Sequence, residues 1–153
     1  MQPSCAVPGR EDSVTDQELA LRQFDELEQR IAALQALAPL DVERLATDSS
    51  FAAVVERHLQ VATQVAIDLG TWIIADHGWR EPRTYADTFY VLGDEGFLDS
   101  ALANRLAEMA RYRNVLVHAY MDVSNEVTAR LASEGLADLQ ALAARFAEEY
   151  TSP

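Results

Sequence analysis

Apolar residues recur at steps of three and four through most of the chain, which is the period of amphipathic helices. The first such stretch begins near Thr15 and stops before Pro39. Thr15 and Glu18 fit a capping box, so we expect a helix to start at Ser13 or Thr15 and to end before the proline. Its apolar face is formed by Leu19, Phe24, Leu27, Ile31, Leu34 and Leu37.

A wider apolar pattern predicts a long helix from about Asp48 to Ala75, after a short helical piece at residues 41–46. Gly70 inside the long helix indicates close packing against a neighbour. An apolar surface of this width is typical of the central helix of a bundle, packed on more than one side. Its two neighbouring stripes are Phe51, Val55, Leu59, Ala62, Ala66, Leu69 and Ile73, and Val54, Val61, Val65 and Trp72.

The rest of the chain also reads as helices separated by turn residues. Gly78 and Pro82 mark a break after the long helix, and residues 93–96 form a turn. Further helices are expected at 84–92, from 99 or 100 through 120, and from about 126 to 150 as one or two helices. The pattern contains no strand and no repeat. We therefore predict an all-α, single-domain antiparallel bundle of about five helices over residues 13–150, preceded by a disordered tail at 1–12.

Composition adds limits to this picture. With 153 residues, 49% of them hydrophobic, the chain can bury a core as one domain. Cys5 is the only cysteine, which excludes a disulfide framework and a cysteine-based metal site. No apolar run is long enough to span a membrane, and no signal peptide is recognisable, so the expected location is the cytoplasm.

The charge balance bears on possible partners. Twelve basic and 25 acidic residues give 12 − 25 = −13, which argues against a broad nucleic-acid-binding surface. It leaves room for a small basic pocket, and Arg105, Arg111 and Arg113 are close together in the sequence.

Residues 111–120, Arg-Tyr-Arg-Asn-Val-Leu-Val-His-Ala-Tyr, carry the residue types that bind phosphate and transfer protons. Arginine presents a fork of donors to phosphate oxygens, and histidine titrates near neutral pH. These two suffice in principle to cleave RNA without a metal: a base deprotonates the 2′-hydroxyl, the oxygen attacks phosphorus, and a cation stabilises the developing charge. Taken singly, an arginine and a histidine near a helix end are more often structural.

Helical geometry constrains this site. Arg113 and His118 are five residues apart and would point about 140° away from each other on a straight helix. Arg111 and Asn114 would share the face of His118, and Arg113 would line up with Tyr120. Either the helix distorts, or a second chain completes the site by two-fold symmetry. No rival site or metal-ligand spacing is found: the histidines His58, His77 and His118 are scattered.

The segment Arg113–Tyr120 resembles the Arg-x4-His-x-Tyr motif of HepT toxins, within the HEPN superfamily of helical ribonucleases. The resemblance runs from about Phe51 to Tyr120. Its other matching segments are His58–Ala62, Ile67–Asp68, Pro82–Leu92, Gly96–Leu98 and Met109–Tyr112.

This resemblance implies a homodimeric, metal-independent endoribonuclease of a type VII toxin–antitoxin system, acting on an RNA such as tRNA or mRNA without a cofactor. Arg113 and His118 would be the catalytic pair, with Asn114 and Arg111 as supporting polar residues. The implied partner is a minimal nucleotidyltransferase (MNT) antitoxin, which adds AMP to Tyr120. The alternatives are a non-catalytic helical module that docks a nucleotidyltransferase, and an oligomeric scaffold in which the motif is structural.

Overall fold

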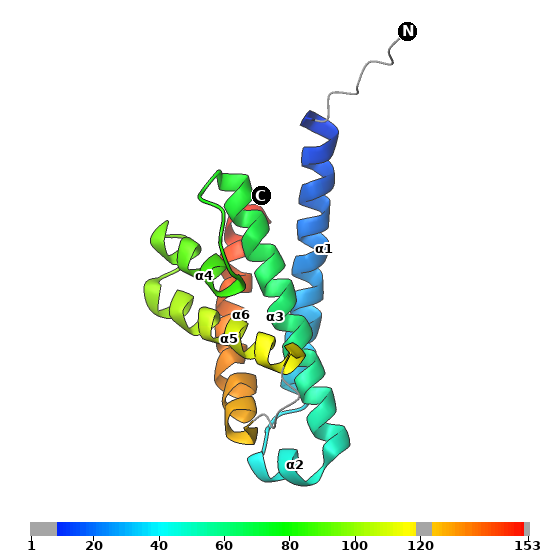
Figure 1. Ribbon diagram of the computed structural model, residues 1–153. Coiled ribbons are helices and arrows are strands. Elements are labelled where there is room, and N and C mark those ends of the chain that lie inside the picture. Colours follow the sequence, from blue (N-terminus) through cyan, green and yellow to red (C-terminus); the bar gives the residue numbers. More distant parts are fainter. Residues whose placement is uncertain (1–8, 119–123, 152–153) are drawn as a thin grey trace.

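The computed structural model describes the backbone of residues 9–118 and 124–151, and the side chains of residues 16–114 and 124–151. The described residues form six helices and no strand (Figure 1). They are α1 (Gly9–Ala36), α2 (Val42–Thr47), α3 (Ser49–His77), α4 (Tyr85–Asp94), α5 (Ser100–His118) and α6 (Asn125–Tyr150). The predicted all-α bundle is confirmed. The number exceeds five because the short piece after Pro39 is a helix in its own right.

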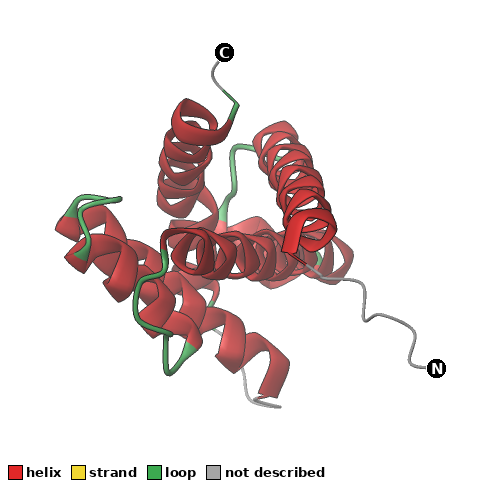
Figure 2. Ribbon diagram, turned by 90° about the horizontal axis from the view of Figure 1, so that it is seen from above, coloured by secondary structure: helices red, strands yellow, loops and turns green. Residues whose placement is uncertain are grey.

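Helix α3 is the centre of the bundle. It contacts all five other described helices, which explains why its sequence carries two apolar stripes. Helices α1 and α6 pack along it and against each other, while α4 and α5 pair on another side (Figures 1 and 2). The end of α5 that carries Arg113 is thereby held against both α3 and α4.

Two clusters of buried side chains make up the core. The larger joins α1, α3, α4, α5 and α6, and its fully buried members include Leu27, Ile67, Leu69, Phe89, Leu106 and Phe146. The smaller includes Tyr112, which lies between the two motif arginines in sequence. The Tyr112 hydroxyl is hydrogen-bonded to that of Thr128 on α6. Burial on one side therefore fixes the rotation of α5 and leaves Arg111 exposed.

The helix boundaries largely follow the predicted signals. Asp48 caps α3 by accepting a hydrogen bond from the Phe51 amide, and Gly78 ends α3 with a φ of 71°. Thr84 caps α4 in the same way through the Asp87 amide. The start of α1 was placed wrongly: the helix begins at Gly9 and runs through the expected cap at Thr15. Residues 9–12 thus belong to α1, and residues 1–8 lie outside the described residues.

A close approach of α4 and α5 makes Gly93 sensitive to substitution. A Cβ at this position would lie 2.8 Å from the Cβ of Ala103, which has no rotamer to change. We therefore expect Gly93→Ala to lower the free energy of unfolding by about 1–3 kcal/mol, measured by urea denaturation. The control is Gly135→Ala on α6, where the clash of a Cβ would be with the flexible tip of Met109, and the Leu131 Cβ would lie in ordinary contact at 3.9 Å. A control that destabilises more than Gly93→Ala would contradict this account.

None of the helices in residues 9–118 and 124–151 is both long and apolar enough to cross a lipid bilayer.

Candidate functional site

Arg113, near the end of α5, is half-buried and incompletely bonded. Its Nη1 donates to Asn114 Oδ1 at 3.3 Å, and its guanidinium lies 5.4 Å from the centre of the Tyr85 ring on α4. Its Nε is buried and has no hydrogen-bond partner among the described residues. An unused donor on a buried cation is unfavourable unless an acceptor arrives, so this guanidinium is suited to bind an anion.

Arg111 also contacts α4, at Tyr90. Its Nη2 donates to the Tyr90 hydroxyl at 2.6 Å, and its guanidinium lies 5.5 Å from the Tyr90 ring. The two motif arginines are therefore both held against tyrosines of α4. Asn114 thus contacts Arg113, whereas Arg111 contacts Tyr90; their role as supporting polar residues stays a prediction.

Two residues expected at the site fall outside the side chains that the structure describes. His118 is the last residue of α5, and its side chain lies outside the described residues, as does all of Tyr120. Helix α5 is continuous from Ser100 to His118. On a continuous helix, residues five positions apart point about 140° away from each other.

Arg105, which the sequence grouped with Arg111 and Arg113, belongs elsewhere. Its Nε donates to Asp138 Oδ1 on α6 at 2.9 Å. That expectation was wrong, because neighbours in sequence diverge around a helix: six residues turn through about 600°, which leaves Arg105 and Arg111 about 120° apart.

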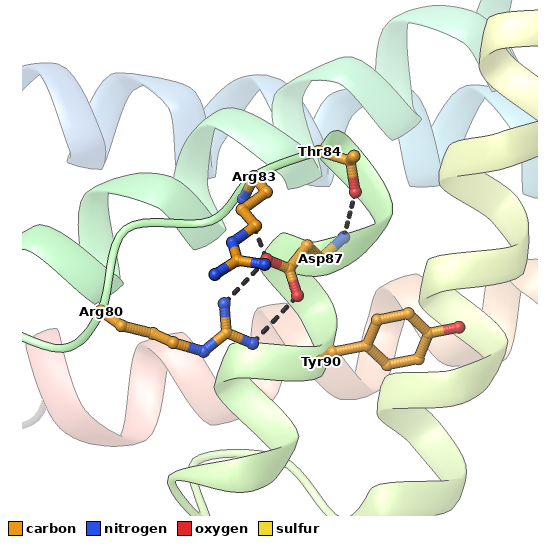
Figure 3. A pocket seen from close by; sticks show the side chains of 5 residues that line it. All are labelled: Arg80, Arg83, Thr84, Asp87 and Tyr90. Carbon is orange, nitrogen blue, oxygen red and sulfur yellow. Dashed lines mark hydrogen bonds and ion pairs between the residues drawn. The ribbon is translucent and has the colours of Figure 1, made fainter.

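The region also contains a hollow that the sequence did not predict. A cavity of about 440 Å³ is lined by Arg80, Arg83, Thr84, Asp87 and Tyr90. Figure 3 shows the Arg80 and Arg83 guanidinium groups near one another, while the Tyr90 ring points away from them toward α5. The sequence signal that could have indicated this hollow is the pair of arginines in the break before α4. Only the folded structure places these arginines close to Tyr90 of that helix.

Asp87 organises this hollow. It accepts two hydrogen bonds from the Arg80 guanidinium, at 2.8 and 3.0 Å, and one from the Arg83 amide at 2.9 Å. The Arg80 hydrogen bonds, followed by that of the Arg83 amide, lower the pKa of Asp87 from 3.8 to about 2. Asp87 is therefore ionised at any physiological pH and holds Arg80 at the rim of the hollow.

This lowered pKa gives a pH-dependent prediction. Because the folded-state pKa is below the unfolded value, Asp87 stabilises the fold above about pH 4, and this is lost as the pH falls toward 2. We expect Asp87→Asn to lower the unfolding free energy at pH 7 by about 1 kcal/mol, discounted for the exposure of Arg80. The difference from the unchanged protein should shrink below pH 4 in urea titrations. A difference that stays constant from pH 7 to pH 3 would exclude this role.

The other polar residues noted in the sequence have structural partners. His58 Nδ1 lies 3.1 Å from Arg30 Nη1, and burial, then the Arg30 charge, lowers the His58 pKa. Asp68 accepts from Gln64 at 2.9 Å. His77 stacks on Trp79 with ring centres 4.1 Å apart. No group of three or more potential metal ligands occurs in the described part of the chain.

The chain is similar to known proteins in both sequence and fold. The profile of a family described as "Ribonuclease HepT-like" matches residues 27–146. The tRNA nuclease HepT of Aphanizomenon flos-aquae is 36% identical over 70 residues, which is 46% of this chain and 48% of the relative. That match spans only about half of the relative's length.

Two similar solved structures show the same helical fold. One is the tri-AMPylated Shewanella oneidensis HEPN toxin in complex with MNT antitoxin, with a TM-score of 0.75 and 19% identity over 82% of this chain and 94% of that one. The other is YutE of Bacillus subtilis, a cytosolic protein of unknown function, with a TM-score of 0.75 and 20% identity over 88% of this chain and 92% of that one.

Proposed function

Because the chain belongs to the HepT-like ribonuclease family, we propose that it is an endoribonuclease whose catalytic residues are Arg113 and His118. The observation that carries this proposal is the state of Arg113. Its guanidinium is half-buried, held against Tyr85, and retains a buried N–H without a partner among the described residues. A guanidinium in this state can bind a phosphate, because its free N–H can donate a hydrogen bond to a phosphate oxygen.

In the proposed reaction His118 is the general base and removes the proton of a ribose 2′-hydroxyl. The 2′-oxygen then forms a bond to the adjacent phosphorus, and the bond from phosphorus to the 5′-oxygen breaks. The departing oxygen takes up a proton, which gives a 2′,3′-cyclic phosphate and a 5′-hydroxyl end. Arg113 stabilises the charge that builds on the phosphoryl oxygens. The internal nucleophile restricts this chemistry to RNA.

We place the cleft between two copies of the chain. Helix α5 has no interruption up to His118, so helical geometry favours the second of the two routes that the sequence left open. A two-fold axis near the end of α5 would bring Arg113 of each copy beside His118 of the other.

The proposed partner is a minimal nucleotidyltransferase antitoxin that modifies Tyr120. The Shewanella oneidensis toxin, which shares the fold, is described as AMPylated and in complex with such an antitoxin. Tyr120 follows Arg113 by seven residues. On a continued helix this is nearly two full turns, so a phosphate on Tyr120 would place negative charge on the side of the arginine.

The direct test is to incubate the purified protein with tRNA and with mRNA, with and without a chelator. We expect new fragments with cyclic phosphate ends, formed equally in both conditions. Fragments that vanish with the chelator and return with a divalent cation would reject the metal-independent mechanism. Intact RNA under all conditions would reject the nuclease and favour a non-catalytic module.

A further inference from the structure

The arginines without a carboxylate partner are concentrated at α4 and α5. All 12 basic residues of the chain are arginines. Five of them form ion pairs with nearby carboxylates: Arg30, Arg44, Arg80, Arg105 and Arg130. Among the described side chains, Arg83, Arg111 and Arg113 have no such pair. Arg22, Arg57 and Arg145 lack one too, but they are spread over α1, α3 and α6, and Arg145 donates to the Phe97 carbonyl.

Arg83 stands between two hollows. It borders the cavity of about 440 Å³ described above and a second of about 230 Å³ on the side of Tyr85 and Thr88. Its backbone amide is bonded to Asp87, but its exposed guanidinium has no hydrogen-bond partner within the described structure. Asp87 binds Arg80 with both carboxylate oxygens, and Asp94 lies 3.9 Å from Arg80, so the positive charge left without a carboxylate partner at the hollow is that of Arg83 (Figure 3).

Two tyrosines of α4 border the hollows and also contact the motif arginines. Tyr85 is 44% exposed, although it is a large aromatic residue, and its ring lies against Arg113. Tyr90 lines the larger hollow and binds Arg111 through its hydroxyl. Each of these two tyrosines of α4 thus brings an aromatic ring to one of the motif arginines.

We propose that Arg83, Tyr85, Tyr90 and Arg111, with Arg80 held by Asp87, form a binding strip for single-stranded RNA that leads to the catalytic motif. Arg83 binds a backbone phosphate several ångströms from the scissile bond, and the Tyr85 ring stacks on an unpaired base. This inference rests on the proposed ribonuclease function. Alternating cations and aromatic rings are the usual means of holding a single strand, because a ring can stack only on a base that is free of a duplex. The proposed strip also explains how a chain with a net charge of −13 can bind RNA, because the contact is confined to this strip.

The test uses the full-length protein carrying His118→Ala, so that RNA is bound but not cut. Binding of a fluorescent single-stranded RNA is measured by anisotropy over a range of salt concentrations. We expect Arg83→Ala to weaken binding about tenfold and to flatten the plot of log K against log salt by about 0.7, the value for one lost phosphate contact. Tyr85→Ala should weaken binding about tenfold with an unchanged salt slope, because stacking releases no counterion.

The matched control is Arg57→Ala, an exposed arginine on α3 without a carboxylate partner in the described structure. It should bind RNA as the parent does, and circular dichroism should show all variants equally folded. If Arg83→Ala binds like Arg57→Ala while the protein with His118 intact cleaves RNA, the strip is rejected and the ribonuclease stands. If the protein neither cleaves nor binds RNA, both proposals fail. If Arg83→Ala impairs only modification by the nucleotidyltransferase, the strip is a protein-docking surface and the RNA proposal is overturned.

Discussion

Replacing His118 by alanine is expected to lower the rate of RNA cleavage by about a thousandfold, the usual contribution of a general base. The reason is that no other histidine can take its place. His58 is bonded to Arg30 and His77 is stacked on Trp79. RNA binding should change little, because a neutral base contributes to the transition state more than to the bound substrate. The measurement is single-turnover cleavage of a labelled RNA, together with growth of cells that express each form.

His77→Ala is the control for this experiment, since it removes a histidine that bonds only Glu149 at the far end of α3 and α6. It should retain full cleavage. Equal cleavage and equal growth with His118→Ala and the unchanged protein would remove His118 from the mechanism.

A mixing experiment then decides where the site is assembled. Arg113→Ala and His118→Ala should each be inactive alone. If each cleft takes Arg113 from one copy and His118 from the other, a mixed dimer contains one intact cleft of two. With free exchange half of the dimers are mixed, so the mixture should regain about a quarter of the original activity. No recovery after verified exchange would place both residues of a site in one chain, and α5 would then have to distort between them.

The helices could be predicted because each has a local signal. The two apolar stripes of α3 indicated a helix covered on several sides, and α3 does contact all the other described helices. Asp48 and Gly78 mark its ends through caps made within a few residues. The start of α1 was misplaced because Thr15 and Glu18 look like a cap, but nothing in the sequence before them stops the helix from continuing to Gly9.

The surroundings of the motif could not be predicted in the same way. The contacts of Arg111 with Tyr90 and of Arg113 with Tyr85 join residues more than 20 positions apart, and they depend on how α4 packs on α5. The pairing of Arg80 with Asp87 crosses from a loop into a helix. Such contacts are set by tertiary packing, which no hydrophobic period encodes. The sequence predicts which residues react, whereas only the fold shows which residues of α4 lie beside Arg111 and Arg113.

Tyr120→Phe is expected to make the protein insensitive to the proposed nucleotidyltransferase. In the proposed modification the Tyr120 phenol oxygen forms a bond to the α-phosphorus of ATP, and pyrophosphate leaves. Phenylalanine keeps the ring but lacks the oxygen, so it can accept no AMP. The unchanged protein, incubated with its nucleotidyltransferase and ATP, should gain mass in units of AMP and lose cleavage. The Tyr120→Phe protein should gain none and keep cleaving.

The loss of activity follows from charge. Each attached phosphate would bring a negative group to the side of Arg113, where it competes with the RNA phosphate for the same guanidinium. Tyr150→Phe is the matched control, because that hydroxyl is already bonded to Asp76 and lies at the other end of α6. It should be modified and inactivated like the unchanged protein, by mass spectrometry and by cleavage assay. If Tyr120→Phe is still modified, another tyrosine is the acceptor. If the modified protein still cleaves RNA at the original rate, the phosphate does not reach Arg113, and neutralisation must then act through the bound antitoxin itself.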